Sequence, residues 1–290
     1  LNKMKIQYEN RVMSSLLLYI DHFVCEKGEA FTNSNSYFYE TNQTYSNLFN
    51  YSSPYKQLVA DDSVSNANVI KSVYIDSGGS FKEFQVGSSG VSAIDHTDAL
   101  VQTTVQITGS NRISGNFAVK EFNTYLTNKA EEKILFETKY QLKPKTPQTL
   151  SGLPPDTETY PAIFLKNMSA ENTPGAYGGL DLSNITARAV VLADSAYNLD
   201  AVCSILADRN KTVVTFIEQS LPFNAVGAYT GQAYNYTGLV DAATGEAKTG
   251  IFIDNVSVSK NVAGDYSSLN PNVYTAFVDF ELNQFRFPRK

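Results

Sequence analysis

Hydrophobic and polar positions alternate most regularly near the end of the chain. One side of this pattern reads Tyr274, Ala276, Val278, Phe280 and Leu282, and the other reads Thr275, Phe277, Asp279, Glu281 and Asn283. A period of two residues predicts a half-buried β-strand. Arg286, Arg289 and Lys290 follow, with Pro288 among them, so we expect the strand to leave its sheet and to offer a short basic tail.

A period of three to four residues predicts two helices. Residues 4–27 place apolar side chains at helical spacing and end at Gly28, which is a common stop signal. Residues 195–209 form the second predicted helix, with Asp194 or Ser195 as its N-cap. Strands are expected around it at 161–167, 185–193 and 251–259. Together with the closing strand they predict an α+β fold, in which helices flank an antiparallel sheet.

The region before these elements is rich in strands and turns. Predicted strands between residues 69 and 143 are separated by Gly- and Ser-rich turns, which is typical of a small sandwich or barrel. Prolines are dense between residues 144 and 161, which indicates a domain boundary or an extended crossover. The expected organisation is an N-terminal helix and aromatic-rich arm at 1–68, an inserted β-rich domain at 69–143, a Pro-rich crossover at 144–160 and an α+β core domain at 161–290.

Residues 29–68 fit neither period. The stretch is aromatic and polar, and its aromatic side chains need a surface to pack against. It is therefore either an ordered loop or an arm that docks on a neighbouring subunit. The aromatic residues considered for such an arm are Tyr37, Phe38, Tyr39, Tyr45, Phe49, Tyr51 and Tyr55.

Charge and cysteine usage narrow the function classes. The net charge is −6 and the cations are scattered, which argues against a protein whose main task is to grip phosphate backbones. Cys25 and Cys203 each lie in a predicted helix, so we interpret them as buried small apolar residues and expect no disulfide. The longest early apolar run, "SSLLLYI", is too short to span a membrane, and no membrane contact is expected.

The chain has two histidines that could carry protons. His22 lies in the first predicted helix and is interpreted as structural. His96 has Asp95 and Asp98 beside it, an arrangement that could suit a metal ion or an acid–base pair. A polar turn between two strands explains the same residues, and we favour that interpretation.

Strong catalytic motifs are missing from the sequence. It contains no dinucleotide-binding or phosphate-binding glycine loop, no nucleophile elbow, no CxxC pair and no His-Glu-X-X-His. The carboxylate pairs Asp61–Asp62 and Glu131–Glu132 are expected on the solvated surface, because sequence neighbours do not face each other across a substrate. We therefore expect no enzyme activity, no cofactor and no metal. A glycoside hydrolase with two distant carboxylates stays open, although the chain has no tryptophan to stack on sugar rings.

Several segments in the second half of the chain carry a resemblance to known proteins. The segments that carry the resemblance are "TYPAIFLKN", "ITARAVVLA", "YNLDAVCSIL", "SILADRN" and "TAFVDFELNQFRFPR". They are similar to the tail-completion and neck proteins of contractile-tailed bacteriophages, and most similar to the terminators that cap the tail tube or sheath. The resemblance covers about residues 160–290 and rests on pattern.

This resemblance implies a virion protein of the tail or neck, assembled in the host cytoplasm. It implies a ring, commonly a homohexamer, that stops tail polymerisation and joins the tail to the head connector, with DNA only passing through its lumen. The acidic charge suits such a lumen, because it repels phosphate. Arg286, Arg289 and Lys290 would then dock on a neighbouring tail or neck protein, and residues 37–55 would clamp the adjacent subunit. The alternative is a carbohydrate-binding or adhesive virion module of the baseplate or fibre.

Overall fold

The computed structural model confirms the α+β class. It describes residues 7–45, 48–87, 90–107, 112–128, 161–175, 179–218, 220–224, 229–243, 250–260 and 273–287. Within these ranges the chain forms a six-stranded sheet, a seven-stranded sheet and three helices. None of the helices in these ranges is long and apolar enough to cross a membrane.

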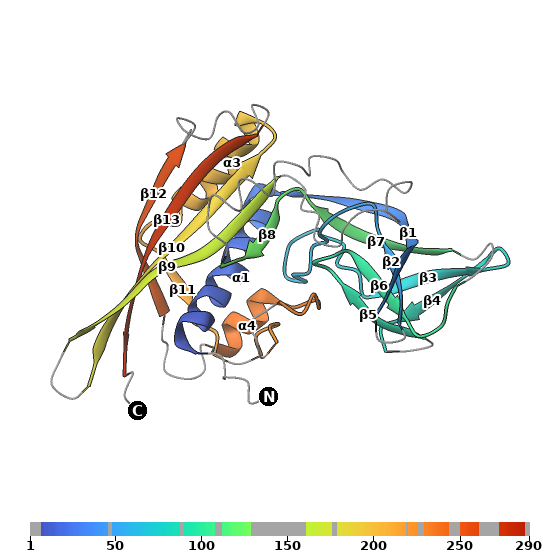
Figure 1. The fold of residues 1–290 in the computed structure, drawn as a ribbon, viewed down its shortest axis with the longest axis horizontal. Helices are drawn as coiled ribbons and strands as arrows, with labels where there is room; N and C mark the ends of the chain where they lie inside the picture. The colour runs from blue at the N-terminus through green and yellow to red at the C-terminus, as the bar shows by residue number, and fades with distance from the viewer. Residues whose placement is uncertain are drawn as a thin grey trace.

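The six-stranded sheet comes mainly from the second half of the chain. Its strand order is β11-β12-β13-β10-β9-β8, and all neighbours are antiparallel except β8 and β9. Figure 1 shows it on the left of the molecule. Its strands are β8 (Asn123–Leu126), β9 (Ala162–Pro174), β10 (Asp181–Ala193), β11 (Val213–Thr215), β12 (Gly250–Lys260) and β13 (Tyr274–Arg286).

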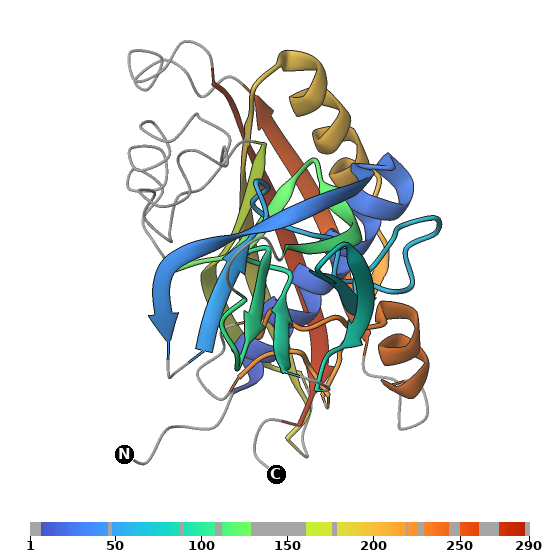
Figure 2. The same cartoon turned by 90° about the vertical axis from the view of Figure 1, so that its right-hand side faces the viewer.

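Two helices cover one face of this sheet. Helix α1 (Tyr8–Gly28) and helix α3 (Ala196–Ala207) lie on the same side of the strands (Figure 2). The alternating pattern of the closing strand is confirmed, because Val278 and Phe280 are fully buried in the core that also holds Leu199 and Val202 of α3. The last strand therefore packs beneath the second predicted helix. A short third helix, α4 (Tyr236–Ala243), follows later in the chain.

The helix ends show how the sequence fixes local structure. Ser195 is the N-cap of α3, and its hydroxyl accepts a hydrogen bond from the Asn198 backbone amide at 3.2 Å. At the end of α1 the residue in the left-handed region is Glu29, with φ 46°, not Gly28. Gly28 lies against α3 instead: a Cβ there would lie 2.9 Å from Cδ1 of Ile205. The glycine permits close packing of the two helices.

The seven-stranded sheet holds the second core. Its strand order is β4-β3-β7-β1-β2-β6-β5, with neighbours antiparallel, and it lies on the right in Figure 1. Phe38, Leu58, Val101 and Phe117 are buried in its core. Its strands are β1 (Phe31–Tyr45), β2 (Leu48–Ser52), β3 (Ser72–Ser77), β4 (Ser80–Gln85), β5 (Val91–Asp95), β6 (Leu100–Thr103) and β7 (Ile113–Lys120).

This sheet corrects the expected boundary at residue 68. Strands β1 and β2 lie before that boundary, yet β1 pairs with β7 over eight residue pairs from Phe31↔Lys120 to Phe38↔Ile113. Strand β8 lies within the predicted β-rich domain but pairs with β9 of the other sheet. The boundary fails because strand pairing joins segments that are distant in sequence. The Pro-rich crossover at 144–160 lies outside the described residues.

We expect the buried face of β13 to dominate the stability of the six-stranded sheet. Replacing Phe280 with alanine leaves a cavity among α3, β10 and β12, so the free energy of unfolding should fall by about 3–5 kcal/mol. Glu281 is the next residue and is exposed, which makes Glu281→Ala the matched control, with an effect within about 0.5 kcal/mol. Urea denaturation of both variants measures the difference. Equal losses would contradict the described burial of this strand.

Candidate functional site

A buried aspartate of α1 joins elements of both sheets. Asp21 is 4% exposed, and its Oδ1 accepts from the Lys120 ammonium at 2.5 Å and from the Thr124 hydroxyl at 2.6 Å. Its Oδ2 accepts from the Tyr234 hydroxyl at 3.0 Å. Lys120 ends β7 of the seven-stranded sheet, and Thr124 belongs to β8 of the six-stranded sheet. One carboxylate thus contacts both sheets and the segment before α4.

Charge pairing and burial stabilise the contacts of Asp21 with Lys120 and Tyr234. The Lys120 and Asp21 side chains are 7% and 6% exposed, so their charges are paired away from water. Two further hydrogen bonds satisfy the carboxylate, which is what a buried ion pair requires to offset its desolvation. Burial, followed by the negative charges of Asp21 and Asp61, raises the pKa of Tyr234 well above its usual value. Tyr234 therefore remains a hydroxyl donor to Asp21.

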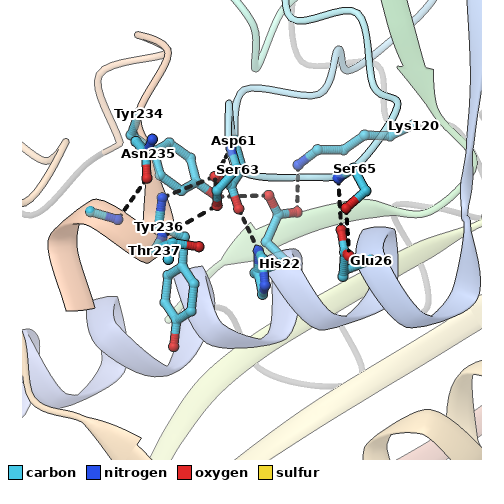
Figure 3. Close-up of polar contacts among 12 residues, drawn as sticks. His22, Glu26, Asp61, Ser63, Ser65, Lys120, Tyr234, Asn235, Tyr236 and Thr237 are labelled. Carbon is cyan, nitrogen blue, oxygen red and sulfur yellow. Dashed lines mark hydrogen bonds and ion pairs between the residues drawn. The ribbon is translucent and has the colours of Figure 1, made fainter. Parts of the chain in front are cut away.

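The next residue of α1 starts a second polar contact. His22 Nδ1 lies 2.7 Å from Oδ2 of Asp61, and the His22 ring stacks on Tyr236 with centroids 4.7 Å apart. Figure 3 shows Asp61 between His22, Ser63 and Tyr236. Oδ1 of Asp61 accepts from the Ser63 amide at 3.0 Å, the Ser63 hydroxyl at 2.6 Å and the Tyr236 amide at 2.9 Å. The contact connects α1, the segment between β2 and β3, and the start of α4.

The position of Asp61 corrects a prediction. Asp61 is 0% exposed and is not part of the solvated surface, because besides Ser63 it contacts His22 and Tyr236, which lie 39 and 175 residues away in sequence and pack over it. Burial raises the pKa of this carboxyl, but the hydrogen bonds from His22, Ser63 and Tyr236 outweigh burial and lower it overall. Its neighbour Asp62 is on the surface, as predicted, with its side chain 39% exposed and 2.7 Å from Lys71. The predicted surface pair at 131–132 lies outside the described residues.

His96 lies in a turn between β5 and β6, as predicted. Oδ1 of Asp95 accepts from the backbone amides of Thr97 and Asp98 at 2.9 and 3.2 Å, which fixes the turn. The His96 ring is buried, with Nδ1 2.8 Å from the Gly231 carbonyl and Nε2 3.2 Å from the Ile70 carbonyl. Burial lowers the pKa of His96, although both carbonyl contacts raise it. The histidine holds the turn against the 229–236 segment.

These groups position the elements that carry them. The described residues contain no group of three or more His, Cys, Asp or Glu side chains placed to hold a metal ion. His22 with Asp61 has the geometry of a base and its orienting carboxylate, yet the described contacts of His22 include no hydroxyl or thiol nucleophile. Both cysteines are free and buried, as predicted. Burial raises the pKa of the Cys25 thiol and raises that of Cys203 to about 11, so both remain protonated thiols at neutral pH.

The predicted docking residue Arg286 is held by its own chain. Its guanidinium lies 3.7 Å from the centroid of the Tyr8 ring, and its Nε donates to the Ser183 hydroxyl at 2.6 Å. Its Nη2 also donates to Asn172 at 3.3 Å. Pairing with Asp181 keeps Arg286 inside β13, so the strand has not left the sheet at this position. Arg289 and Lys290 lie outside the described residues.

The predicted inter-subunit arm is corrected in part. Phe38 and Tyr51 are 4% and 3% exposed in the core of the seven-stranded sheet, where Phe38 contacts Phe117 with ring centroids 5.4 Å apart. They are therefore unavailable to a partner, because β1 and β2 have alternating faces and these two side chains point inward. Tyr37, Tyr39, Phe49 and Tyr55 are half-buried in the same chain, and the Tyr45 side chain lies outside the described residues.

The six-stranded sheet has a second face that carries exposed aromatic side chains. Phe285 is 62% exposed and Phe252 is 37% exposed. Phe285 pairs with Leu182, and Phe252 pairs with Asn283, two residues before Phe285, so these side chains share the face opposite α1 and α3. We call Leu182, Phe252 and Phe285 the open-face patch. It lies near the β9–β10 hairpin, whose residues 168–175 are exposed and extend beyond the body in Figure 1.

Asp21, Lys120 and Tyr234 were not identified from the sequence. The available signal was a charged residue at the end of the apolar run "SSLLLYI", on the buried side of a helix. A buried carboxylate needs a donor, but its donors lie 99 to 213 residues away, so the sequence does not reveal them.

No protein-family model matches the chain, and no curated protein matches it significantly in sequence.

The Asp21 contacts generate a stability prediction. Asp21→Asn leaves the Lys120 ammonium buried without its counter-charge, so the free energy of unfolding should fall by about 3–5 kcal/mol. The double variant Asp21→Asn with Lys120→Met removes the unpaired charge and should recover part of this loss. Tyr234→Phe removes one hydrogen bond and should cost about 1 kcal/mol. A double variant that is less stable than Asp21→Asn by urea denaturation would contradict the buried ion pair.

Because His96 is buried, we expect the stability of the folded chain to depend on pH. Because its folded-state pKa is lowered from 6.5, the unfolded chain binds a proton more readily than the folded chain as the pH falls through 6.5. Stability should therefore decrease on going from pH 7.5 to pH 5.5, with a slope of at most about 1.4 kcal/mol per pH unit from this group. His96→Gln should flatten the profile of thermal unfolding measured across that range. An unchanged slope in the variant would show that other groups cause the dependence.

Proposed function

We propose that this protein is a structural subunit of a phage virion, a tail terminator or neck protein that forms a ring and joins the tail to the head connector. The open-face patch is the observation that supports an assembly function most directly. One face of the six-stranded sheet is covered by α1 and α3, while the other exposes Phe252 and Phe285. Clustered exposed aromatic side chains are typical of protein interfaces.

The proposed ring requires two different surfaces on each subunit. A head-to-tail contact closes into a ring when one surface of each copy fits a second surface of the next copy. We assign the open-face patch to one of these surfaces and the exposed hairpin of β9 and β10 to the other. In this proposal Arg289 and Lys290 dock on the neighbouring tail or neck protein. Arg286 does not take part, because it binds Tyr8 and Ser183 of its own chain.

The charge of the chain agrees with a ring through which DNA passes. A net charge of −6 per subunit repels phosphate, so the lumen conducts DNA and does not bind it. Partners are then further copies of this chain and the neighbouring tail or neck proteins. We further propose that the seven-stranded sheet is an inserted module of sandwich or barrel type, attached to the core that forms the ring. The protein would be located in the virion and not in a membrane.

A second candidate function is adhesion through the seven-stranded sheet. Strand β4 forms one edge of that sheet, and its side chains are almost all exposed, with Phe81 at 51%. Exposed aromatic faces on an edge strand suit stacking on sugar rings. An adhesive virion module would bind glycans through this edge, whereas a ring subunit would not need to.

Light scattering of the purified chain tests the ring. We expect a species of about six-fold the monomer mass, and Phe285→Ser should shift it toward monomer because a serine removes most of the apolar area of the patch. Phe81→Ser is the matched control, since Phe81 is similarly exposed but lies on the other sheet. A ring that forms equally well with Phe285→Ser would contradict the assigned surface. A chain that stays monomeric at all concentrations and does not bind tail tubes would contradict the proposed function.

A further inference from the structure

A cavity of about 250 Å³ lies where the two sheets meet. Its wall includes Leu17, Leu18 and Asp21 of α1, Lys120 at the end of β7, and Thr124 to Leu126 of β8. The turn that contains His96 and Thr97 closes another side. The cavity is therefore built from both sheets and the first helix, and the junction of two units is a common position for small-molecule sites.

The wall is mainly apolar and aromatic. Among the described residues, four leucines line it together with Tyr125, Tyr229 and Tyr234. An apolar cavity of about 150 Å³ already admits a benzene-sized molecule. The volume at the junction thus suits one substituted ring, and aromatic walls favour stacked or edge contacts with it.

Two polar groups in the wall retain hydrogen-bonding capacity. Oγ1 of Thr97 is buried and has no hydrogen-bond partner among the described residues. The Lys120 ammonium has three protons, and its described contacts are the Asp21 carboxylate and the Thr124 hydroxyl. A ligand oxygen could therefore accept from the ammonium and exchange a hydrogen bond with Thr97, which would satisfy a buried group that is costly to leave unpaired.

The charges near the wall select against anions. Asp21, Asp61 and Asp95 all act on the hydroxyl of Tyr229, whose pKa is raised chiefly by burial and then by these carboxylates. Among the described residues that line the cavity, Lys120 is the one lysine or arginine, and its charge is already paired with Asp21. A carboxylate or phosphate entering the cavity would lose its hydration beside Asp21 and would find the Lys120 charge already paired, whereas a neutral molecule avoids both costs.

We propose that the cavity between the two sheets binds a neutral single-ring molecule that carries one hydroxyl or carbonyl oxygen. The ring lies among the leucines and tyrosines, and the oxygen lies toward Thr97 and Lys120. This site is independent of the proposed ring assembly. Because the ligand contacts both sheets, binding stabilises their junction and raises the melting temperature of the whole chain.

Methyl NMR of the full chain, titrated with phenol, tests the site. We expect saturable shifts of the methyl groups of Leu17, Leu18 and Leu126. Benzoate has the same ring but a negative charge at neutral pH, and should bind at least tenfold more weakly. Thr97→Val should weaken phenol binding about three- to tenfold, through the loss of one hydrogen bond. Thr186→Val is the matched control. Thr186 lies on β10, on the face of the six-stranded sheet opposite α1, so this variant should leave the dissociation constant unchanged.

A filled cavity provides the second test. Ala60 lines the cavity, and Ala60→Leu should abolish saturable binding while leaving a cooperative thermal transition. Leu126→Phe serves the same purpose if Ala60→Leu does not fold. The proposal is overturned if phenol gives no saturable shifts in these methyl groups, if benzoate binds as tightly, or if a folded cavity-filling variant retains the wild-type dissociation constant.

Discussion

The arrangement of the two sheets depends on one buried carboxylate. Asp21 receives hydrogen bonds from the end of β7, from β8 and from the segment before α4, so residues 120–124 and the distant Tyr234 must both be in place before it is satisfied. Apolar contacts are largely non-directional, and many relative positions of two sheets would bury similar areas. Short hydrogen bonds to a charged group are directional, and they select one of those positions.

Contacts of the segment 229–236 also help to fix the relative position of the two sheets. Its Gly231 carbonyl binds the turn of His96, its Tyr234 hydroxyl binds Asp21, and its Tyr236 amide binds Asp61. Gly231 has φ +73°, and a Cβ at this position would collide with the Asp95 carboxylate. A glycine is therefore required where this segment meets the seven-stranded sheet. The core of each sheet is apolar, whereas the 229–236 segment is held mainly by hydrogen bonds.

Local helices and strands could be predicted well from the sequence, whereas contacts between residues distant in sequence could not. Helix α1, the Ser195 cap and the alternating faces of β13 follow from spacing and from capping chemistry, which act within a few residues. Strand β1 was missed because "FTNSNSYFYETNQTY" has many polar positions, and the long pairing with β7 stabilises it as a strand. Asp61 was misplaced for a related reason, since its burial depends on His22 and Tyr236, which no local pattern connects to it.

The cavity between the two sheets and the open-face patch lie at different ends of the six-stranded sheet. Tyr125 lines the cavity and stacks on Phe164 at 5.1 Å, and Phe164 packs with Val190 and Leu192 at one end of the open face. The open-face patch lies at the other end of the same face. Between them, Arg188 binds Asp279 through two hydrogen bonds of 2.6 and 2.8 Å, and Thr186 and Asn184 continue a polar stretch along β10. A polar, hydrogen-bonded stretch of the sheet therefore separates Phe164, which contacts the cavity residue Tyr125, from Phe252 and Phe285.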